Sequence, residues 1–143
     1  MLNLDLLKEL IRCKAVTENV EGVNRAVDRM HEFLKNKGLH CTVETLNGRK
    51  ILYAATVPGK TPDVLLNAHL DVVPAPDSMF EPEERDGKLF ARGSSDCQGN
   101  SLVLAEVLSS LVGKASCFRP MRRPAVRQPL IWWNAVTERR RSF

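Results

Sequence analysis

The chain has 143 residues, of which 43% are hydrophobic and 27% charged, a composition typical of one soluble globular domain. Its net charge of +4 arises at its end, because residues 1–114 carry 14 basic and 16 acidic side chains whereas residues 115–143 carry seven Arg and one Glu. The positive charge therefore gives no reason to assign nucleic-acid binding to the first 114 residues.

Two amphipathic helices are the first predicted elements. Apolar residues at helical spacing predict a helix over about residues 3–13, and the charged residues between them leave no uninterrupted apolar stretch for a signal peptide. A second apolar stripe over residues 23–34 predicts another helix, which Gly38 ends.

Strand patterns follow the two helices. Residues 40–46 alternate in polarity, and Asn47-Gly48 is a two-residue hairpin signal before a strand over residues 51–57. The nearly continuous apolar run of residues 64–68 is typical of a strand that is buried on both faces.

A Pro-rich loop leads to the last predicted elements. Asp86-Gly87 is a turn into a short strand at residues 88–91. Residues 99–112 form a predicted helix with apolar residues on more than half of its surface, so we expect it to be packed on more than one side. Together these elements favour an α/β layered domain with helices on a mixed sheet.

This pattern stops after Lys114. Residues 115–143 contain neither Lys nor Gly, three Pro residues interrupt any helix, and the apolar cluster Leu130–Trp133 has no periodic partner. We interpret the segment as a disordered tail. Its use of Arg in place of Lys suggests a frameshift near residue 114.

Three residues near the predicted buried strand suggest a metal site. His69 and Asp71 point the same way if the chain is extended, so His69 can bind a metal through one ring nitrogen while Asp71 orients the ring. Asp96 stands in a turn between Gly93 and Gly99, and one carboxylate can bridge two metal ions. Each signal alone is weak, because a single His after a strand is more often a loop or core residue.

The joint context of these residues resembles the signature of the dinuclear-zinc amidohydrolases. This family includes aminoacylase, acetylornithine deacetylase, succinyl-diaminopimelate desuccinylase, glutamate carboxypeptidase and Xaa-His dipeptidase. The resemblance implies that residues 1–114 are the N-terminal part of a three-layer α/β/α zinc-exopeptidase-like catalytic domain with a mixed sheet. It rests on three segments, LLNAHLDVVP at residues 65–74, FEP at residues 80–82 and DGKLFARGSSDCQG at residues 86–99.

The resemblance also implies roles for single residues. His69 is a ligand of one zinc ion, Asp71 is the catalytic acid that orients it, and Asp96 bridges both zinc ions, with cobalt or manganese as substitutes. The peptide bond between Asp96 and Cys97 is implied to be cis. The implied reaction is attack of a zinc-bound hydroxide on the amide or peptide carbonyl of a small N-acyl amino acid or peptide. Members of the family are often homodimers through a domain that this chain lacks.

The chain departs from the family pattern at several positions. Ala91 replaces a common Gly and Gln98 a common Lys, which are mild changes. The family also uses a Glu-Glu pair, a later carboxylate and a final His, whereas here His69 is the last His and the only carboxylates after Asp96 are Glu106 and Glu138. Because a catalytic zinc needs three protein ligands, we expect a truncated, inactive fragment with at most weak metal binding.

Other candidate ligands have more ordinary explanations. Cys97 is either a soft extra ligand or, in preference, a packing residue. His31 borders an apolar stripe and His40 begins a strand, so core-edge and turn roles are favoured for both.

Two alternatives to the enzyme fragment stay open. One is a non-enzymatic α/β module whose basic tail binds nucleic acid or an acidic partner, although the seven Arg share no single face. The other is an inactive partner of a full-length homologue. We favour a cytoplasmic protein, because the four Cys form no Cys-x-x-Cys pair and indicate no disulfide framework. We expect no membrane partner, because no apolar run approaches the ~18 residues of a membrane span. We also expect no nucleic-acid partner, because residues 1–114 carry no excess of positive charge.

Overall fold

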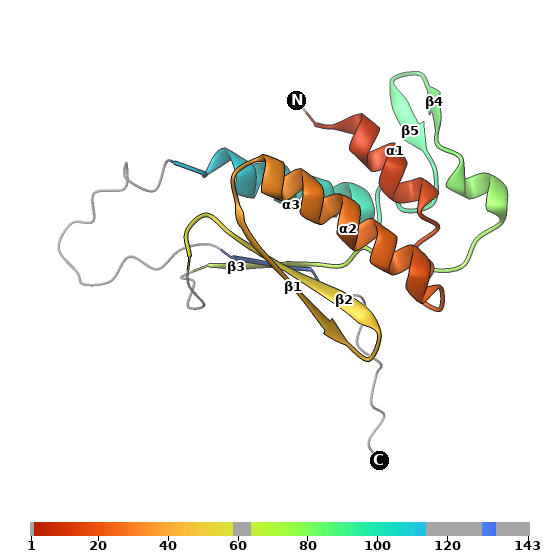
Figure 1. Ribbon diagram of the computed structural model, residues 1–143. Helices are drawn as coiled ribbons and strands as arrows, with labels where there is room; N and C mark the ends of the chain where they lie inside the picture. The colour runs from red at the N-terminus through yellow and green to blue at the C-terminus, as the bar shows by residue number, and fades with distance from the viewer. Residues whose placement is uncertain (1, 59–63, 114–129, 134–143) are drawn as a thin grey trace, which may run out of the picture.

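A computed structural model describes residues 2–58, 64–113 and 130–133 of the chain. Figure 1 shows the three α-helices together on one side of the larger sheet. The helices are α1 (Leu4–Arg12), α2 (Val20–Asn36), the 3-10 helix η1 (Asp77–Phe80) and α3 (Gln98–Ser110). The strands are β1 (His40–Leu46), β2 (Arg49–Ala55), β3 (Leu65–Ala68), β4 (Glu83–Arg85), β5 (Lys88–Phe90) and β6 (Leu130–Trp133).

The two predicted N-terminal helices are confirmed, and each begins at an asparagine. The Oδ1 atom of Asn3 accepts a hydrogen bond of 3.0 Å from the backbone N–H of Leu6 at the start of α1. Asn19 caps α2 in the same way, with a bond of 3.1 Å from the N–H of Gly22. These bonds satisfy backbone donors that the first helical turn leaves without partners.

The larger sheet is mixed, as predicted, with the strand order β1-β2-β6-β3. Strands β1 and β2 form the predicted hairpin, in which Val43 pairs with Leu52. Asn47 and Gly48 in its turn have φ angles of 50° and 77°, the left-handed conformation that a two-residue hairpin turn needs. Strand β6 is antiparallel to β2 and parallel to β3.

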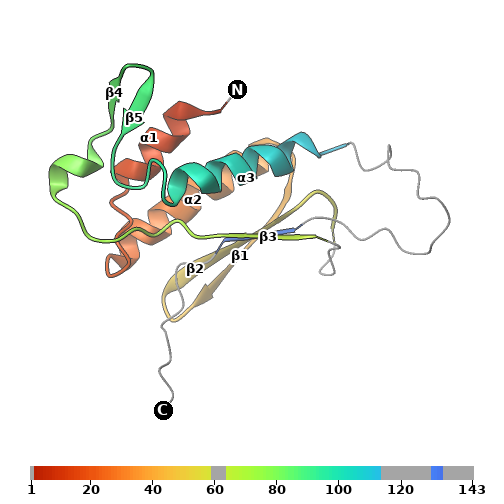
Figure 2. The same ribbon diagram turned by 180° about the vertical axis from the view of Figure 1, so that it is seen from behind.

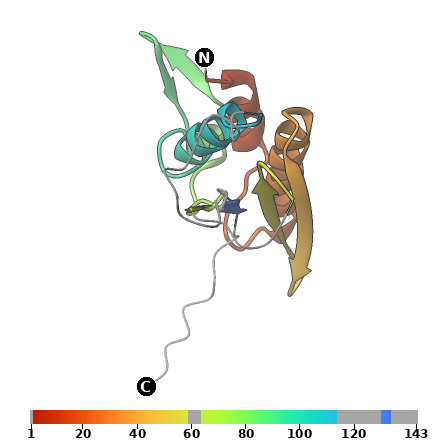
Figure 3. The same ribbon diagram turned by 90° about the vertical axis from the view of Figure 1, so that its left-hand side faces the viewer.

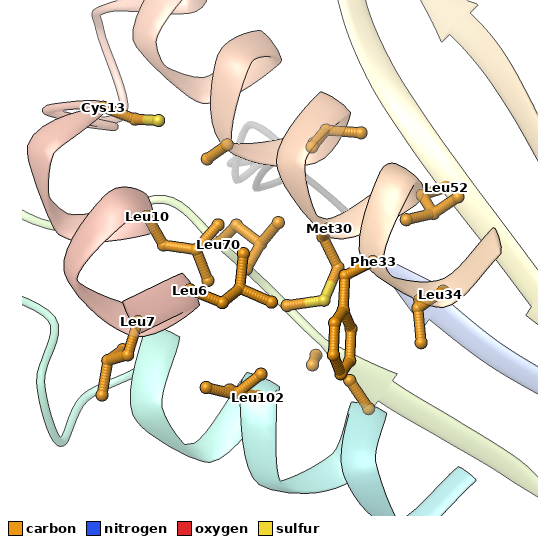
Figure 4. Packing of buried hydrophobic residues seen from close by; sticks show 14 of the residues in the cluster. Leu6, Leu7, Leu10, Cys13, Met30, Phe33, Leu34, Leu52, Leu70 and Leu102 are labelled. Carbon is orange, nitrogen blue, oxygen red and sulfur yellow. The ribbon is translucent and has the colours of Figure 1, made fainter. Parts of the chain in front are cut away.

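The helices and the sheet enclose one hydrophobic core. Helix α2 contacts β1 and β2, and α3 contacts β3, while α1 packs against both helices (Figures 2 and 3). Figure 4 shows side chains from all these layers meeting between the helices and the sheet. The fully buried members with the largest side chains include Leu10, Met30, Leu34, Leu52, Leu70 and Leu102.

Strand β3 and helix α3 are less buried than the sequence predicts. Leu65 in β3 is 55% exposed, because β3 is the last strand in the sheet order and has helix α3 over one face. On α3, Val103 and Val107 are 46% and 47% exposed, because the helix packs through its other side. Within the described residues, the expectation of a strand buried on both faces is therefore wrong, whereas α3 packs against both α1 and β3, as expected, and leaves part of its apolar surface exposed.

Strand β6 corrects another expectation. The sequence offered no partner for Leu130–Trp133, yet these residues lie between β2 and β3 in the sheet. A run of four apolar residues is too short to show a period, although its residue types favour strands. The disorder and frameshift expected of the tail concern residues that otherwise lie outside the described ranges.

A second, two-stranded sheet lies beside α1 (Figure 3). Strands β4 and β5 flank the predicted turn at Asp86 and Gly87, whose φ angles are 50° and 71°. Ion pairs join this region to α1, between Lys8 and Glu84 and between Arg12 and Glu81. Among the described residues, no helix has both the length and the apolar character needed to cross a membrane.

Candidate metal centre

His69 stands immediately after β3, where the strand leaves the sheet. Its side chain is 45% exposed, whereas that of Asp71 is 1% exposed. The Nδ1 atom of His69 lies 3.0 Å from the backbone oxygen of Asp71 and 3.2 Å from its Oδ1 atom. Both of these oxygens are acceptors, so we assign the ring proton to Nδ1. The other ring nitrogen, Nε2, is thereby left with a lone pair that can bind a metal.

The buried carboxylate of Asp71 is held by a residue from the segment between α1 and α2. The hydroxyl of Thr17 donates a hydrogen bond of 2.7 Å to Asp71 Oδ2. The backbones of the two segments also pair, because Thr17 N–H donates to the oxygen of Val72 and Val72 N–H donates to the oxygen of Ala15, over 3.1 and 2.8 Å. No local sequence pattern relates Thr17 to Asp71, so this contact is not predictable from the sequence.

Asp96 lies in a tight turn before α3, and the turn depends on glycine. A Cβ atom on Gly99 would lie 1.9 Å from the backbone oxygen of Ser94, a distance that no packed atom tolerates. Gly93 has a φ angle of 89° and accepts a hydrogen bond of 3.0 Å from the N–H of Gly99. The peptide bond between Asp96 and Cys97 is cis, as the family resemblance implies.

The structure brings His69, Asp96 and Cys97 together. One potential ligand atom from each residue lies within 4.8 Å of those from the other two, and no second group of this kind is present in the described ranges. His69 and Asp96 are exposed and Cys97 is half-buried, so a solvated cation can reach all three. Nitrogen, oxygen and sulfur donors in one group fit a zinc-like ion.

Ser101 links two members of this group through α3. Its hydroxyl donates a hydrogen bond of 2.8 Å to the backbone oxygen of His69, and its Oγ lies 3.5 Å from the Sγ of Cys97. Helix α3 therefore sets the spacing between the end of β3 and the turn. Ser101 is not recognisable from the sequence, because a serine one turn into a helix is common and indicates no particular role.

Gln98 supports the same region from inside the core. Its side chain is 1% exposed, and its Nε2 atom donates to the backbone oxygens of Leu10 and Leu70, at 3.3 and 3.0 Å. The side chain thereby ties the end of α1 to the residue between His69 and Asp71. Replacement of the family's common Lys by Gln is therefore compatible with a well-packed turn.

The remaining candidates lie elsewhere. His31 is part of α2 and His40 is the first residue of β1, as the sequence predicts, and neither belongs to the group around His69. Glu106 lies in α3 outside that group, and Glu138 is outside the described residues.

Comparison with known proteins identifies the family. Residues 65–116 match Peptidase family M20/M25/M40, and these residues include the whole group described above. The chain is also 32% identical over 119 residues to a succinyl-diaminopimelate desuccinylase of Wolbachia pipientis subsp. Culex pipiens (strain wPip). The chain therefore belongs to peptidase family M20/M25/M40. The resemblance inferred from the sequence motifs is confirmed.

Other relatives of this M20 chain bear different names. A cysteinylglycine-S-conjugate dipeptidase of Corynebacterium striatum is 41% identical over 56 residues, which are 35% of this chain and 12% of that protein. The alignment with the Wolbachia desuccinylase covers 78% of this chain and 29% of the relative. The chain thus spans under a third of the length of these relatives.

Solved structures support the M20 fold. An M20 family metallo-carboxypeptidase, Sso-CP2 from Sulfolobus solfataricus, matches with a TM-score of 0.72 and 20% identity, over 92% of this chain and 30% of that one. Human carnosine dipeptidase 1 matches with a TM-score of 0.69 and 16% identity, over 92% and 31%. The partial α/β catalytic-domain fold predicted from the sequence is therefore confirmed.

Proposed function

We propose that this chain supplies the first part of the active site of a metal-dependent hydrolase, which cleaves amide or peptide bonds in N-acyl amino acids or small peptides. The observation that carries the proposal is the oriented His69 ring beside Asp96, at the end of a strand in an M20 sequence. The substrate class is suggested by relatives that are named as a desuccinylase and a dipeptidase.

In this proposal the chain's own residues hold and orient the ion. His69 Nε2 and the Asp96 carboxylate are the ligands, and zinc is the expected metal, with cobalt or manganese as substitutes. Asp71 keeps the proton on Nδ1 and stabilises positive charge on the ring, because its buried carboxylate is 3.2 Å away. A bound divalent cation supplies a Lewis acid that polarises the substrate carbonyl and lowers the pKa of water.

We further propose that residues 1–143 alone are a truncated and inactive form of this catalytic unit. The carboxylates after Asp96 are Glu106, which does not belong to the group around His69, and Glu138, which lies outside the described residues. A general base contributes about 100-fold to 10,000-fold in rate, so its absence removes turnover even where the metal binds. Translation of the nucleotides after codon 114 in the other two frames tests the frameshift, because one frame should encode the Glu-Glu pair and a later His.

Metal binding and turnover of the purified chain test the function directly. We expect Zn²⁺ to bind the chain, His69→Ala to weaken that binding, and neither protein to hydrolyse N-acyl amino acids or dipeptides. Turnover that disappears in His69→Ala would overturn the inactivity and imply that Glu138 or a second chain completes the site. Zn²⁺ binding that does not depend on His69 or Asp96 would overturn the metal-site assignment itself.

The nucleic-acid alternative rests on the Arg-rich residues 115–143, most of which lie outside the described ranges. Salt-sensitive DNA binding that is lost on deletion of these residues would support it. We infer a cytoplasmic location for the hydrolase from the sequence pattern, and cell fractionation tests that inference.

A further inference from the structure

We propose that Cys97 is a third metal ligand in this chain, so that His69, Asp96 and Cys97 together bind a single zinc-like cation. The inference rests on the proposed function, because it shares His69 and Asp96 with it. It goes further by adding a sulfur ligand that the M20 resemblance does not assign. It also revises the preference for a packing role that the sequence alone gave Cys97.

The distances within the group allow a shared ion. Its three potential ligand atoms lie within 4.8 Å of one another. Zinc binds nitrogen and oxygen at about 2.0–2.2 Å and sulfur at about 2.3 Å, so the ligands of a tetrahedral ion lie about 3.4–3.7 Å apart. The side chains that would close this difference are exposed or half-buried.

The number and type of ligands favour this arrangement. Two protein ligands leave a catalytic zinc one short, whereas His, Asp and Cys give three and leave a fourth position open. A thiolate is a soft ligand that favours zinc and cobalt over magnesium, calcium or manganese. The proposal therefore predicts that the site prefers zinc and cobalt to manganese, a preference that a site made only of carboxylates would not have.

The Cys97 side chain is not used to cap the helix that it begins. Cys97 is the N-cap residue of the 13-residue helix α3, and its side chain caps no backbone N–H. On binding, the thiol proton passes to solvent as the Sγ–metal bond forms. Ser101 Oγ, which donates to the His69 backbone oxygen, lies 3.5 Å from Sγ.

The chain contains a matched control for this cysteine. Cys41 in β1 is half-buried like Cys97 but lies outside the ligand group. Burial raises the pKa of the Cys41 thiol to about 11, so this thiol is poorly suited to metal binding near neutral pH. A Cys41→Ser variant thus removes a thiol without changing the proposed site.

Absorption spectroscopy of the Co²⁺-loaded chain tests the proposal without reference to activity. A sulfur ligand produces a thiolate-to-cobalt charge-transfer band in the near ultraviolet. We expect this band in the unmodified chain and in Cys41→Ser, and we expect it to be absent in Cys97→Ser. Zn²⁺ affinity, measured by competition with a chelator, should fall at least about 10-fold in Cys97→Ser, since even residues outside the ligand shell contribute that much.

A second measurement requires no variant. Zn²⁺ should protect Cys97, and not Cys41, from alkylation by iodoacetamide, as mapped by mass spectrometry. Co²⁺ bound without the sulfur band, together with Zn²⁺ affinity unchanged in Cys97→Ser, would overturn the role of Cys97 and leave the proposed function intact. Absence of binding that depends on His69 would overturn both.

Discussion

Thr17 donates a hydrogen bond of 2.7 Å to Asp71 Oδ2, although 54 residues separate the two along the chain. Asp71 in turn lies 3.2 Å from His69 Nδ1, so the hydroxyl, the carboxylate and the imidazole form a continuous series. The series begins in the segment between α1 and α2 and ends at a solvent-exposed ring. The orientation of His69 is therefore set by the packing of the N-terminal helices as well as by β3.

The first prediction concerns this hydroxyl. Thr17→Val keeps the shape of the side chain but removes the donor, which leaves one oxygen of the buried Asp71 without its partner. We expect Zn²⁺ affinity to fall about 10-fold, the lower end of the range for residues that orient a ligand. The free energy of unfolding should fall by about 1–3 kcal/mol. Chelator competition and urea denaturation measure the two effects.

Thr17→Ser is the matched control, because it retains the hydroxyl. It should keep most of the affinity that Thr17→Val loses. Equal losses in the two variants would show that the methyl group, and not the hydrogen bond, is what matters at this position.

The turn before α3 gives the second prediction. Gly99→Ala would place a Cβ atom 1.9 Å from the Ser94 backbone oxygen, so the turn must shift. We expect a loss of about 1–3 kcal/mol in the free energy of unfolding, the usual cost of overpacking, together with weaker Zn²⁺ binding as Asp96 moves. Asn100→Ala, at the exposed next position, should change neither quantity by a comparable amount.

Local patterns account for much of the fold. Apolar spacing predicts α1 and α2, and Asn47-Gly48 predicts the hairpin, because these features depend on neighbours in sequence. The His69 and Asp71 pair is likewise visible, since residues two apart share a face of extended chain. The same reasoning underestimates the exposure of Leu65, because the sequence pattern does not reveal that β3 ends the sheet order.

Long-range contacts account for what the sequence could not predict. Thr17 reaches Asp71 only when two distant segments pair, and Ser101 meets the backbone of His69 across the packing of α3 on β3. Strand β6 lies in the sheet between β2 and β3, which come much earlier in the chain. No periodicity within a single segment encodes such contacts.

Gln98 provides the third prediction. Its Nε2 atom donates to the buried oxygens of Leu10 and Leu70, and Gln98→Leu would leave both without this donor. Because the Leu10 oxygen also accepts from the N–H of Cys13, only the Leu70 oxygen is left without a donor, and we expect a loss of about 1–3 kcal/mol in the free energy of unfolding. Urea denaturation measures it. A Gln98→Leu variant as stable as the parent chain would show that neither bond contributes to folding.

The fourth prediction is a loss of stability at alkaline pH that depends on Cys41. Burial raises the pKa of its thiol from 9.0 to about 11, and the positive charge of Lys35 offsets part of this increase. The unfolded chain therefore loses the proton at a lower pH than the folded chain does. The stabilising contribution of the neutral thiol is complete below pH 9 and is lost as pH rises to about 11.

Urea denaturation of the parent chain and of Cys41→Ser at pH 8, 9.5 and 11 measures the effect. We expect a steeper decline in the parent chain, because serine does not ionise in this range. Parallel pH profiles would show that the Cys41 thiol titrates alike in the folded and unfolded chains.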